Sequence, residues 1–380
     1  MKHKTSKLSI YEYENSIILP RIFSEQSPIW GLGGVCDKNN NFIKQAFYDG
    51  GWAKQGGFYL WNQEEYVDEE VIYLGLFLSH WGHFLIDLTN RMWAVPQIVK
   101  SKCTVKIAYI GEEEPKGNNL RFLELLGINK AQLVHVTKPT RFKKVYIPEQ
   151  GFKSCEWYTN EFLNMLNEIV RKALNSKFDF SRVSNIDKVY FTRRKLGKAI
   201  GSEFGEEYFE KCFIENGYTS LAPETLTLEE QIYVWNHASR IACINGTIPL
   251  NVMFTVNSAL ELLILNKTSI YHENPIILLE MRKIKAQFLN IFKEPLKCYP
   301  RSLGEGPYLL WPTEDFKHFC KKYKFKLGIS GGKEKRYFFN QILKYFFAVF
   351  ALKSKIRNVI SKAIPLSVRR KVKNLKNIWK

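Results

Sequence analysis

The chain has 380 residues, 45% of them hydrophobic and 14% aromatic, which is enough for more than one packed core. Its formal net charge is +19, but residues 331–380 hold 14 Lys and Arg against one acid, Glu334, so the remaining 330 residues are nearly balanced. This distribution argues against a basic nucleic-acid-binding body, and a mean hydropathy of −0.25 argues against a multi-spanning membrane protein.

The cysteines and the N-terminal residues indicate the compartment. Seven cysteines are scattered along the chain without a CxxC pair, so we expect reduced thiols rather than a disulfide framework or a zinc knuckle. The longest apolar run near the N-terminus, Ile17 to Leu19, is too short for a secretory signal peptide. We therefore expect a cytoplasmic protein.

The first half of the chain predicts strands followed by helices. Residues 1–75 are rich in Tyr, Trp and Gly, with glycine clusters at 31–34 and 50–51, and predict short strands and turns. Residues 80–95 follow a helical period, with Phe84, Leu88, Met92 and Val95 on one stripe. Further strands are predicted at 104–110 and 144–148, and an amphipathic helix at 159–174.

Strand and helix patterns alternate between residues 188 and 265. Strands are predicted at 188–192, 240–244 and 259–265, and a helix at 205–216 that stops at Gly217. Thr227 to Glu230 is a capping box that opens a second helix, and a third is predicted to start at Asn251. This alternation predicts a parallel sheet covered on both faces.

Three polar side chains share one stripe of the predicted 80–95 helix. His80, His83 and Asp87 follow one another at i, i+3 and i+7. They could bind a metal with further ligands, form structural hydrogen bonds, or transfer a proton beside a substrate hydroxyl. No HExxH-type metal signature is present.

Three further features could carry binding chemistry, and the first lies where open α/β sheets bind ligands. Arg193 follows a predicted strand and is either a diphosphate clamp or part of a solvated basic loop. The turn at Gly246, between a strand and a helix, points backbone N–H groups at an anion. Glu261 lies in an apolar run and needs a partner, which a ribose diol or a neighbouring cation would supply.

The tail combines aromatic and basic residues. Residues 337–352 hold seven aromatic side chains and one charge, Lys344, over a length too short to span a bilayer as a helix. The last residues place Val368, Val372, Leu375 and Trp379 on one helical face among basic residues. An anionic membrane surface is the expected partner of residues 337–380; nucleic-acid contact and a solvated tail are the alternatives.

Taken in order, these motifs resemble the core of glycosyltransferase family 61. The matching residues are Arg193-Arg194, Lys198, Glu203, Asn216-Gly217-Tyr218, Pro223-Glu224, Leu226-Thr227, Glu230-Gln231, Ala238 to Ala242, Gly246, Asn251 and Glu261-Leu262. The upstream Gly82-His83-Phe84-Leu85-x-Asp87 is similar to the second signature of that family. Three positions depart from the family pattern: Lys198, Ser202 and Asn245.

The resemblance implies an α/β protein of the GT-B-like kind, with two facing Rossmann-like domains and a basic amphipathic C-terminal helical tail. The implied boundaries are 1–180 for the acceptor-side domain, 181–330 for the donor-binding domain and 331–380 for the membrane-associating tail. It also implies an inverting transferase that moves a hexosyl, N-acetylhexosaminyl or pentosyl group from a nucleotide sugar to a glycan in bacterial surface polysaccharide synthesis. Such an enzyme would work at the inner face of the cell membrane on a lipid-linked acceptor.

The resemblance also implies roles for individual residues. Asp87 or His83 would be the catalytic base, and positive charge would replace a metal or other cofactor. The implied donor-binding residues are Arg193, Lys198, Glu203, Glu224, Gln231, Asn245, Gly246, Thr247, Asn251 and Glu261. The main alternative is a non-catalytic protein of the same fold that binds a sugar nucleotide or glycan. A dehydrogenase is disfavoured because no GxGxxG with a downstream acid follows a predicted strand.

Overall fold

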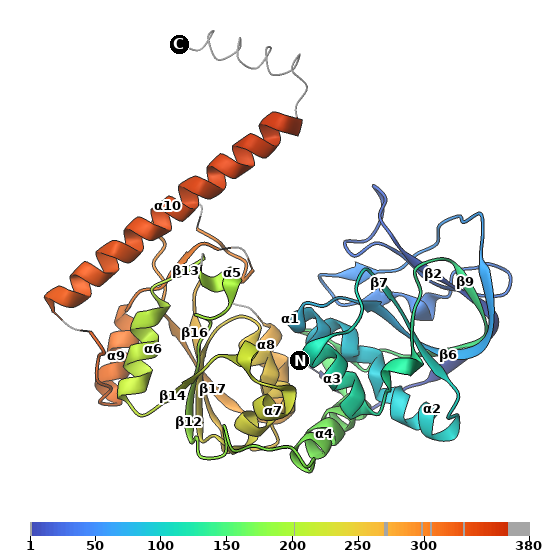
Figure 1. Cartoon of the computed structure of the whole chain (residues 1–380), viewed down its shortest axis with the longest axis horizontal. Helices are drawn as coiled ribbons and strands as arrows, with labels where there is room; N and C mark the ends of the chain where they lie inside the picture. Colours follow the sequence, from blue (N-terminus) through green and yellow to red (C-terminus); the bar gives the residue numbers. More distant parts are fainter. Residues whose placement is uncertain are drawn as a thin grey trace, which may run out of the picture. The chain divides into compact units, whose positions relative to one another are not determined.

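The computed structural model describes residues 2–200, 202–269, 273–297, 299–304, 306–329 and 331–363 (Figure 1). Contact density groups the chain into two compact units. Unit 1 comprises Met1–Val189, Thr225–Ile264 and Tyr271–Gln287. Unit 2 comprises Tyr190–Glu224, Leu265–Ile270 and Phe288–Lys380. Strands and helices are present throughout, so the expected α/β class is confirmed; the boundaries expected at residues 180 and 330 remain a prediction.

Unit 1 is built on a mixed six-stranded sheet with the order β3-β2-β9-β6-β7-β8. The strands are β2 (Ile10–Ile22), β3 (Leu32–Cys36), β6 (Glu65–Phe77), β7 (Lys106–Gly111), β8 (Leu133–His135) and β9 (Thr140–Pro148). Strand β2 pairs antiparallel with β3 and β9, whereas β9, β6, β7 and β8 pair in parallel. The N-terminal residues therefore form strands as predicted, but β2 and β6 have 13 residues each and are not short.

Helices and short hairpins complete unit 1. The predicted amphipathic helix is α4 (Asn160–Leu174), which buries Phe162, Leu166, Ile169 and Val170, and α3 (Gly117–Leu126) packs against it. A hairpin of β4 (Tyr48–Asp49) and β5 (Lys54–Gln55) lies outside the main sheet, as do β1 (Lys2–Lys4), β10 (Phe152–Lys153) and β11 (Trp157–Thr159). The single-turn 3-10 helices η1 (Lys44–Ala46) and η4 (Lys130–Gln132) are connectors.

The predicted helix at 80–95 is divided into four short segments. They are α1 (Trp81–His83), the π-helix η2 (Phe84–Leu88), the 3-10 helix η3 (Thr89–Ala94) and α2 (Val95–Ser101). The predicted apolar stripe is buried, at 0–4% exposure for Phe84, Leu88, Met92 and Val95. Periodicity identified the buried face correctly, but it could not reveal the π segment, a feature that is frequent at functional sites.

The second sheet has five strands in the order β14-β12-β15-β16-β17. They are β12 (Lys188–Phe191), β14 (Thr219–Leu221), β15 (Arg240–Ile244), β16 (Glu261–Asn266) and β17 (Lys285–Asn290). Strands β12, β16 and β17 contribute residues to both units. In chain order the arrangement is 2-1-3-4-5, one of the orders of doubly wound α/β folds.

Backbone hydrogen bonds fix the direction of these strands. Ser239 N donates to Asp187 O at 2.8 Å, and Glu261 N donates to Ser239 O at 3.0 Å, so β12, β15 and β16 start side by side. Thr192 N donates to Leu221 O, which aligns the ends of β12 and β14. The predicted parallel arrangement is therefore present. The strand order reverses between β12 and β15, and ligands of such sheets bind beyond the carboxyl ends at that point.

The following helices and short strands precede or follow the strands of this second sheet along the chain. They are α5 (Gly197–Ile200), β13 (Glu203–Phe204), α6 (Glu206–Glu215), η5 (Pro223–Thr225), α7 (Leu228–His237), η6 (Ile248–Phe254), α8 (Asn274–Arg282), β18 (Tyr308–Leu309) and α9 (Glu314–Lys322). Thr227 and Glu230 form the predicted capping box of α7. The helix expected at Asn251 is the seven-residue 3-10 helix η6, which begins three residues earlier.

The tail begins with a long helix, α10 (Gly332–Ala363). Phe338, Tyr345 and Val349 are buried, and α10 contacts β13 and β18 within unit 2, so part of the aromatic content belongs to the core. The opposite side exposes Phe339, Leu343, Phe347 and Phe350. The predicted amphipathic face at 368–379 lies outside the described residues. Among the helices described, none has the length and apolar character needed to cross a membrane.

Candidate functional site

The centre of the candidate site in unit 1 is a hydrogen-bonded pair of His83 and Asp87. Nδ1 of His83 lies 2.9 Å from Oδ2 of Asp87. The Asp87 carboxylate is fully buried, whereas the His83 side chain is 32% exposed. Because an ionised carboxylate can only accept a hydrogen bond, Nδ1 carries the proton and Nε2 is the nitrogen that can receive one. The pair thus has the geometry of a histidine base oriented by an acid.

Tyr48 holds the other oxygen of Asp87. Its hydroxyl donates to Asp87 Oδ1 at 2.6 Å, and burial together with the charge of Asp87 raises the pKa of Tyr48 well above its usual value. Tyr48 therefore remains a donor and keeps the carboxylate satisfied. Nearby, Arg91 donates to Phe47 O at 2.9 Å and to Pro148 O, and burial lowers its pKa to about 10, which leaves it charged.

The turn before His83 packs against the Gly246 motif inside unit 1. A Cβ on Gly82 would lie 3.1 Å from Thr247 Oγ1, closer than most such contacts, so the two segments pack tightly here. One residue earlier, Trp81 Nε1 donates to Asn251 Oδ1 at 3.0 Å. Two motifs that are about 165 residues apart in sequence are therefore in direct contact, and the predicted base and the predicted anion turn belong to one local structure.

The residues of the Gly246 motif have different surroundings. Asn245 and Asn251 are buried, whereas Gly246 and Thr247 are half-buried. Gly246 has a φ of 159°, an extended conformation that requires no special residue. The Asn251 amide is used inside the protein, because its Nδ2 donates to Ile248 O at 3.0 Å and its oxygen accepts from Trp81. Asn251 thus ties η6 to α1 and does not face a ligand.

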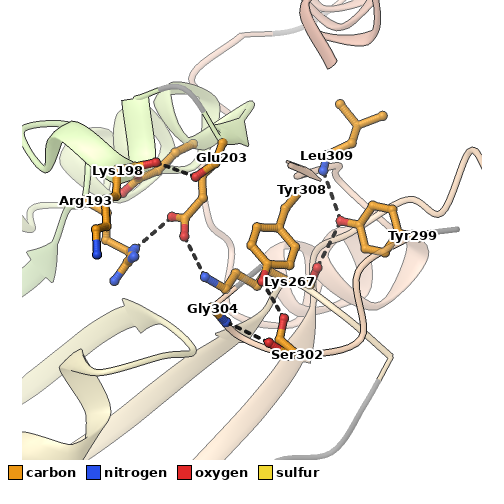
Figure 2. Close-up of polar contacts among 11 residues, drawn as sticks. Arg193, Lys198, Glu203, Lys267, Tyr299, Ser302, Gly304, Tyr308 and Leu309 are labelled. Atoms are coloured by element: carbon orange, nitrogen blue, oxygen red, sulfur yellow. Dashed lines mark hydrogen bonds and ion pairs between the residues drawn. The ribbon is translucent and has the colours of Figure 1, made fainter. Parts of the chain in front are cut away.

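Unit 2 contains the second part of the candidate site, a buried charge cluster (Figure 2). Arg193 Nε donates to Glu203 Oε2 at 2.8 Å, and Lys267 Nζ lies 2.6 Å from the other oxygen of Glu203. Burial disfavours a charged Glu203, but the positive charges of Lys267 and Arg193 outweigh it and lower the pKa of Glu203. Glu203 therefore serves as an internal counter-ion that orients Arg193. Its carboxylate is used inside the protein and not for the sugar-donor contact that the sequence predicted.

Arg193 stands two residues beyond the end of β12. Its backbone N–H donates to Glu206 Oε1 at 2.7 Å, which fixes the residue at the end of the strand. Its side chain is 15% exposed, and its one side-chain hydrogen bond among the described residues uses Nε. The two terminal nitrogens of the guanidinium remain available as a fork for a planar or tetrahedral anion.

Lys267 contacts two tyrosines, Tyr308 of β18 with its side chain and Tyr299 with its backbone. Its ammonium is 4.3 Å from the ring centroid of Tyr308, and its backbone carbonyl accepts from the Tyr299 hydroxyl at 3.0 Å (Figure 2). The same Tyr299 oxygen accepts from Leu309 N at 3.0 Å. These contacts fix the cation that balances Glu203, and so fix Arg193 indirectly.

Four of the predicted donor-binding residues are not gathered at this site. Lys198 is exposed on α5, and Glu224 is exposed on η5. Gln231 is buried, and its Nε2 donates to Leu226 O at 3.3 Å. Glu261 starts β16 at the amino edge of the sheet and forms an ion pair with Arg240 at 2.7 Å. Of the two partners expected for Glu261, a ribose diol or a neighbouring cation, the structure shows the cation.

Sequence reasoning missed Tyr48 and Lys267. Tyr48 stands two residues before the Gly50-Gly51 turn, and nothing in the sequence links it to Asp87. Lys267 directly follows β16 and stands two residues beyond the predicted strand 259–265, a position like that of Arg193. The rule that ligand-binding residues lie at strand ends applies to Lys267 as it does to Arg193. Within the described residues, no group of three or more His, Cys, Asp or Glu side chains could hold a metal ion.

The fold and these contacts define an α/β protein with a doubly wound sheet, a histidine–carboxylate pair and an oriented arginine at a strand end. Residues 81–260 match the model of the family Glycosyltransferase 61. The matched segment includes His83, Asp87, Arg193 and the Gly246 turn, and it supports a glycosyltransferase role with a sugar donor and a glycan acceptor. No curated protein matches the chain.

Proposed function

We propose that this protein is an inverting glycosyltransferase that uses a nucleotide sugar, with His83 as its catalytic base. The observation that carries the proposal is the 2.9 Å contact between His83 and the buried Asp87, in a turn that packs on Thr247. The family match covers both motifs. In this proposal Asp87 is a positioning residue, since it contributes by orienting the imidazole and stabilising its charged form.

The proposed reaction is a single displacement. Nε2 of His83 accepts the proton of an acceptor hydroxyl while that oxygen attacks the anomeric carbon of the donor sugar. The bond from the anomeric carbon to the diphosphate breaks on the opposite face, so the anomeric configuration inverts. The nucleoside diphosphate leaves with the electron pair, and Arg193 neutralises the charge that develops on it.

The donor proposal relies on sheet topology and on Arg193. β12 and β15 flank the point at which the strand order reverses, and Arg193 and Gly246 each stand two residues beyond the end of one of these strands. Arg193 supplies a bidentate fork for the diphosphate. We leave Lys198, Glu224, Gln231 and Glu261 out of the proposed donor contacts because of where their side chains lie.

The GT-B-like layout of two facing Rossmann-like domains remains part of the proposal. One doubly wound sheet and one mixed sheet with parallel central strands support it. We further propose that the acceptor is a lipid-linked bacterial glycan at the inner face of the cell membrane. The exposed face of α10, with Phe339, Leu343, Phe347 and Phe350, supports attachment to an anionic lipid surface, as does the excess of 13 positive charges in residues 331–380.

A non-catalytic binding protein of the same fold is the rival function. The buried, fully bonded Asp87 beside His83 argues against it, because a protein that only binds has no need of an oriented base. Thermal-shift screening against UDP-, GDP- and dTDP-sugars tests donor use, since a ligand of the native state raises its stability. We expect one donor class to stabilise the protein and to be consumed when n-octyl glycosides are added as acceptors. Stabilisation without consumption would favour the rival.

A further inference from the structure

Trp52 lies beside the proposed base and is more than half exposed. The indole is 54% exposed, although the ring centroids of Trp52 and His83 are only 5.6 Å apart. Trp52 occupies the turn of the β4–β5 hairpin, within residues 50–53. An exposed indole held next to a catalytic group is a typical feature of ligand sites, where one aromatic face is left for the ligand.

The hairpin that carries Trp52 is anchored on both sides. Asp49 accepts from Lys153 Nζ at 3.0 Å and from Gly51 N at 3.2 Å, and its own N–H donates to Gln150 Oε1 at 3.0 Å. Gly51 has a φ of +80°, which favours glycine, and a Cβ on Gly50 would overlap the Tyr48 hydroxyl. The turn is therefore built to bring Trp52 close to the residues that hold Asp87.

Trp30 joins Trp52 to the proposed catalytic pair. Its buried ring stacks on Tyr48 at 5.7 Å and lies edge-on to both Trp52, at 5.5 Å, and His83, at 5.3 Å. Tyr48 in turn donates to Asp87. Trp52 is thus the exposed member of an aromatic cluster whose buried members position the base.

We propose that Trp52 forms an acceptor subsite by stacking on the apolar face of a pyranose ring. Pyranoses present C–H groups on such a face, and these carry partial positive charge that suits the negative face of an indole. Stacking would place a hydroxyl of the same sugar near Nε2 of His83. This inference rests on the proposed glycosyltransferase function and adds to it the residue that selects and orients the acceptor.

Three variants test the subsite. In Trp52→Ala we expect the KM for an n-octyl glycoside acceptor to rise about tenfold, the scale of one lost aromatic contact, while the donor Kd from calorimetry is unchanged. Trp52→Phe, which keeps a smaller aromatic face, should give an intermediate KM. Tyr66→Ala removes an aromatic side chain of similar exposure, 62%, from β6 and should leave both constants unchanged.

The outcomes separate this inference from the function on which it rests. If the wild-type protein transfers sugar and Trp52→Ala has an unchanged acceptor KM, the subsite is wrong and the glycosyltransferase function stands. If Trp52→Ala weakens donor binding instead, Trp52 contacts the nucleotide and the acceptor assignment is wrong. If the wild-type protein transfers no sugar to any acceptor, the function and this inference fall together.

Discussion

The buried carboxylate of Asp87 lies 2.9 Å from Nδ1 of His83 and accepts a second hydrogen bond, of 2.6 Å, from the Tyr48 hydroxyl. Both carboxylate oxygens are therefore engaged inside the protein, and Asp87 has no exposed surface from which to meet a substrate. The sequence alone left Asp87 and His83 as equal candidates for the base. The partly exposed member of the pair, His83, is the one that can take a proton from an acceptor.

His83→Ala should lower kcat by about 10²–10⁴-fold with little change in donor Kd, because general base catalysis acts on the chemical step. Asp87→Asn should lower kcat as well, since an amide can orient the imidazole in the wrong tautomer. His237→Ala, at an exposed histidine on α7 that bonds to Tyr233 O, is the matched control and should retain activity. A fully active His83→Ala variant would remove His83 from the mechanism.

Arg193→Ala should weaken binding of UDP or GDP by at least tenfold in calorimetry, because the guanidinium fork is lost. Arg193→Lys keeps the charge without the fork and should fall between the wild type and Arg193→Ala. Lys195→Ala removes the same charge from an exposed neighbour and should bind as the wild type does. Equal affinities for Arg193→Ala and Lys195→Ala would place the diphosphate elsewhere.

Glu203→Gln should lower the free energy of unfolding by about 3–5 kcal/mol, because it leaves Lys267 and Arg193 without their buried counter-ion. Glu261→Gln breaks an ion pair with Arg240 in which Glu261 is 69% exposed, and it should cost less than about 1 kcal/mol. Urea denaturation measures both. Similar losses for the two variants would contradict the role given to Glu203.

The buried carboxyl group of Glu206 should make the stability of the folded protein depend on pH. Burial raises its pKa to about 7, although Thr192 and the Arg193 N–H donate to it. The folded state thus holds a proton that the unfolded state releases near pH 4.5, so this group stabilises the protein at low pH and its contribution is lost as pH rises to about 7. The folding stability lost over this pH range is about 3 kcal/mol. In Glu206→Gln this part of the dependence of Tm on pH, measured between pH 5 and 8, should be absent. If Tm changed with pH in the same way in the wild type and in Glu206→Gln, this role of Glu206 would be contradicted.

The two faces of α10 should respond differently to substitution. Replacing exposed Phe347 and Phe350 by Ser should reduce sedimentation with vesicles that contain phosphatidylserine while leaving Tm unchanged, because both side chains face solvent. Phe338→Ala should lower stability by about 3–5 kcal/mol, since Phe338 is 2% exposed and packs on Trp311. Unchanged vesicle binding by the double variant would exclude the exposed face as a membrane contact.

The sequence predicted the periodic elements well and their local distortions poorly. The face of α4, the capping box at Thr227 and the buried strands around β15 follow from spacing and hydrophobicity alone. The π segment at Phe84–Leu88 does not, because an apolar stripe fits several helical periods. Strand length was also underestimated in β2, where Pro20 and Asn15 look like breaks and yet lie within one strand.

The candidate site was predictable only in part. His83, Asp87 and Arg193 were found because chemically active residues stood at helix or strand-end positions. Contacts between distant segments were not predictable, since no local pattern joins Tyr48 to Asp87 or Glu203 to Lys267. For the same reason Glu203 and Asn251 were expected at the donor, whereas their side chains bond to Arg193 and Lys267 and to Trp81, respectively.

The most direct test is to follow sugar transfer itself, with the configuration of the product read by NMR. The wild-type protein is incubated with the nucleotide sugar that stabilises it most and with n-octyl glycosides, beside His83→Ala as the matched variant. We predict a glycoside whose new anomeric centre is inverted relative to the donor, and a loss of product in His83→Ala. Donor binding with no transfer to any acceptor, or a product of retained configuration, would contradict an inverting transferase with His83 as its base.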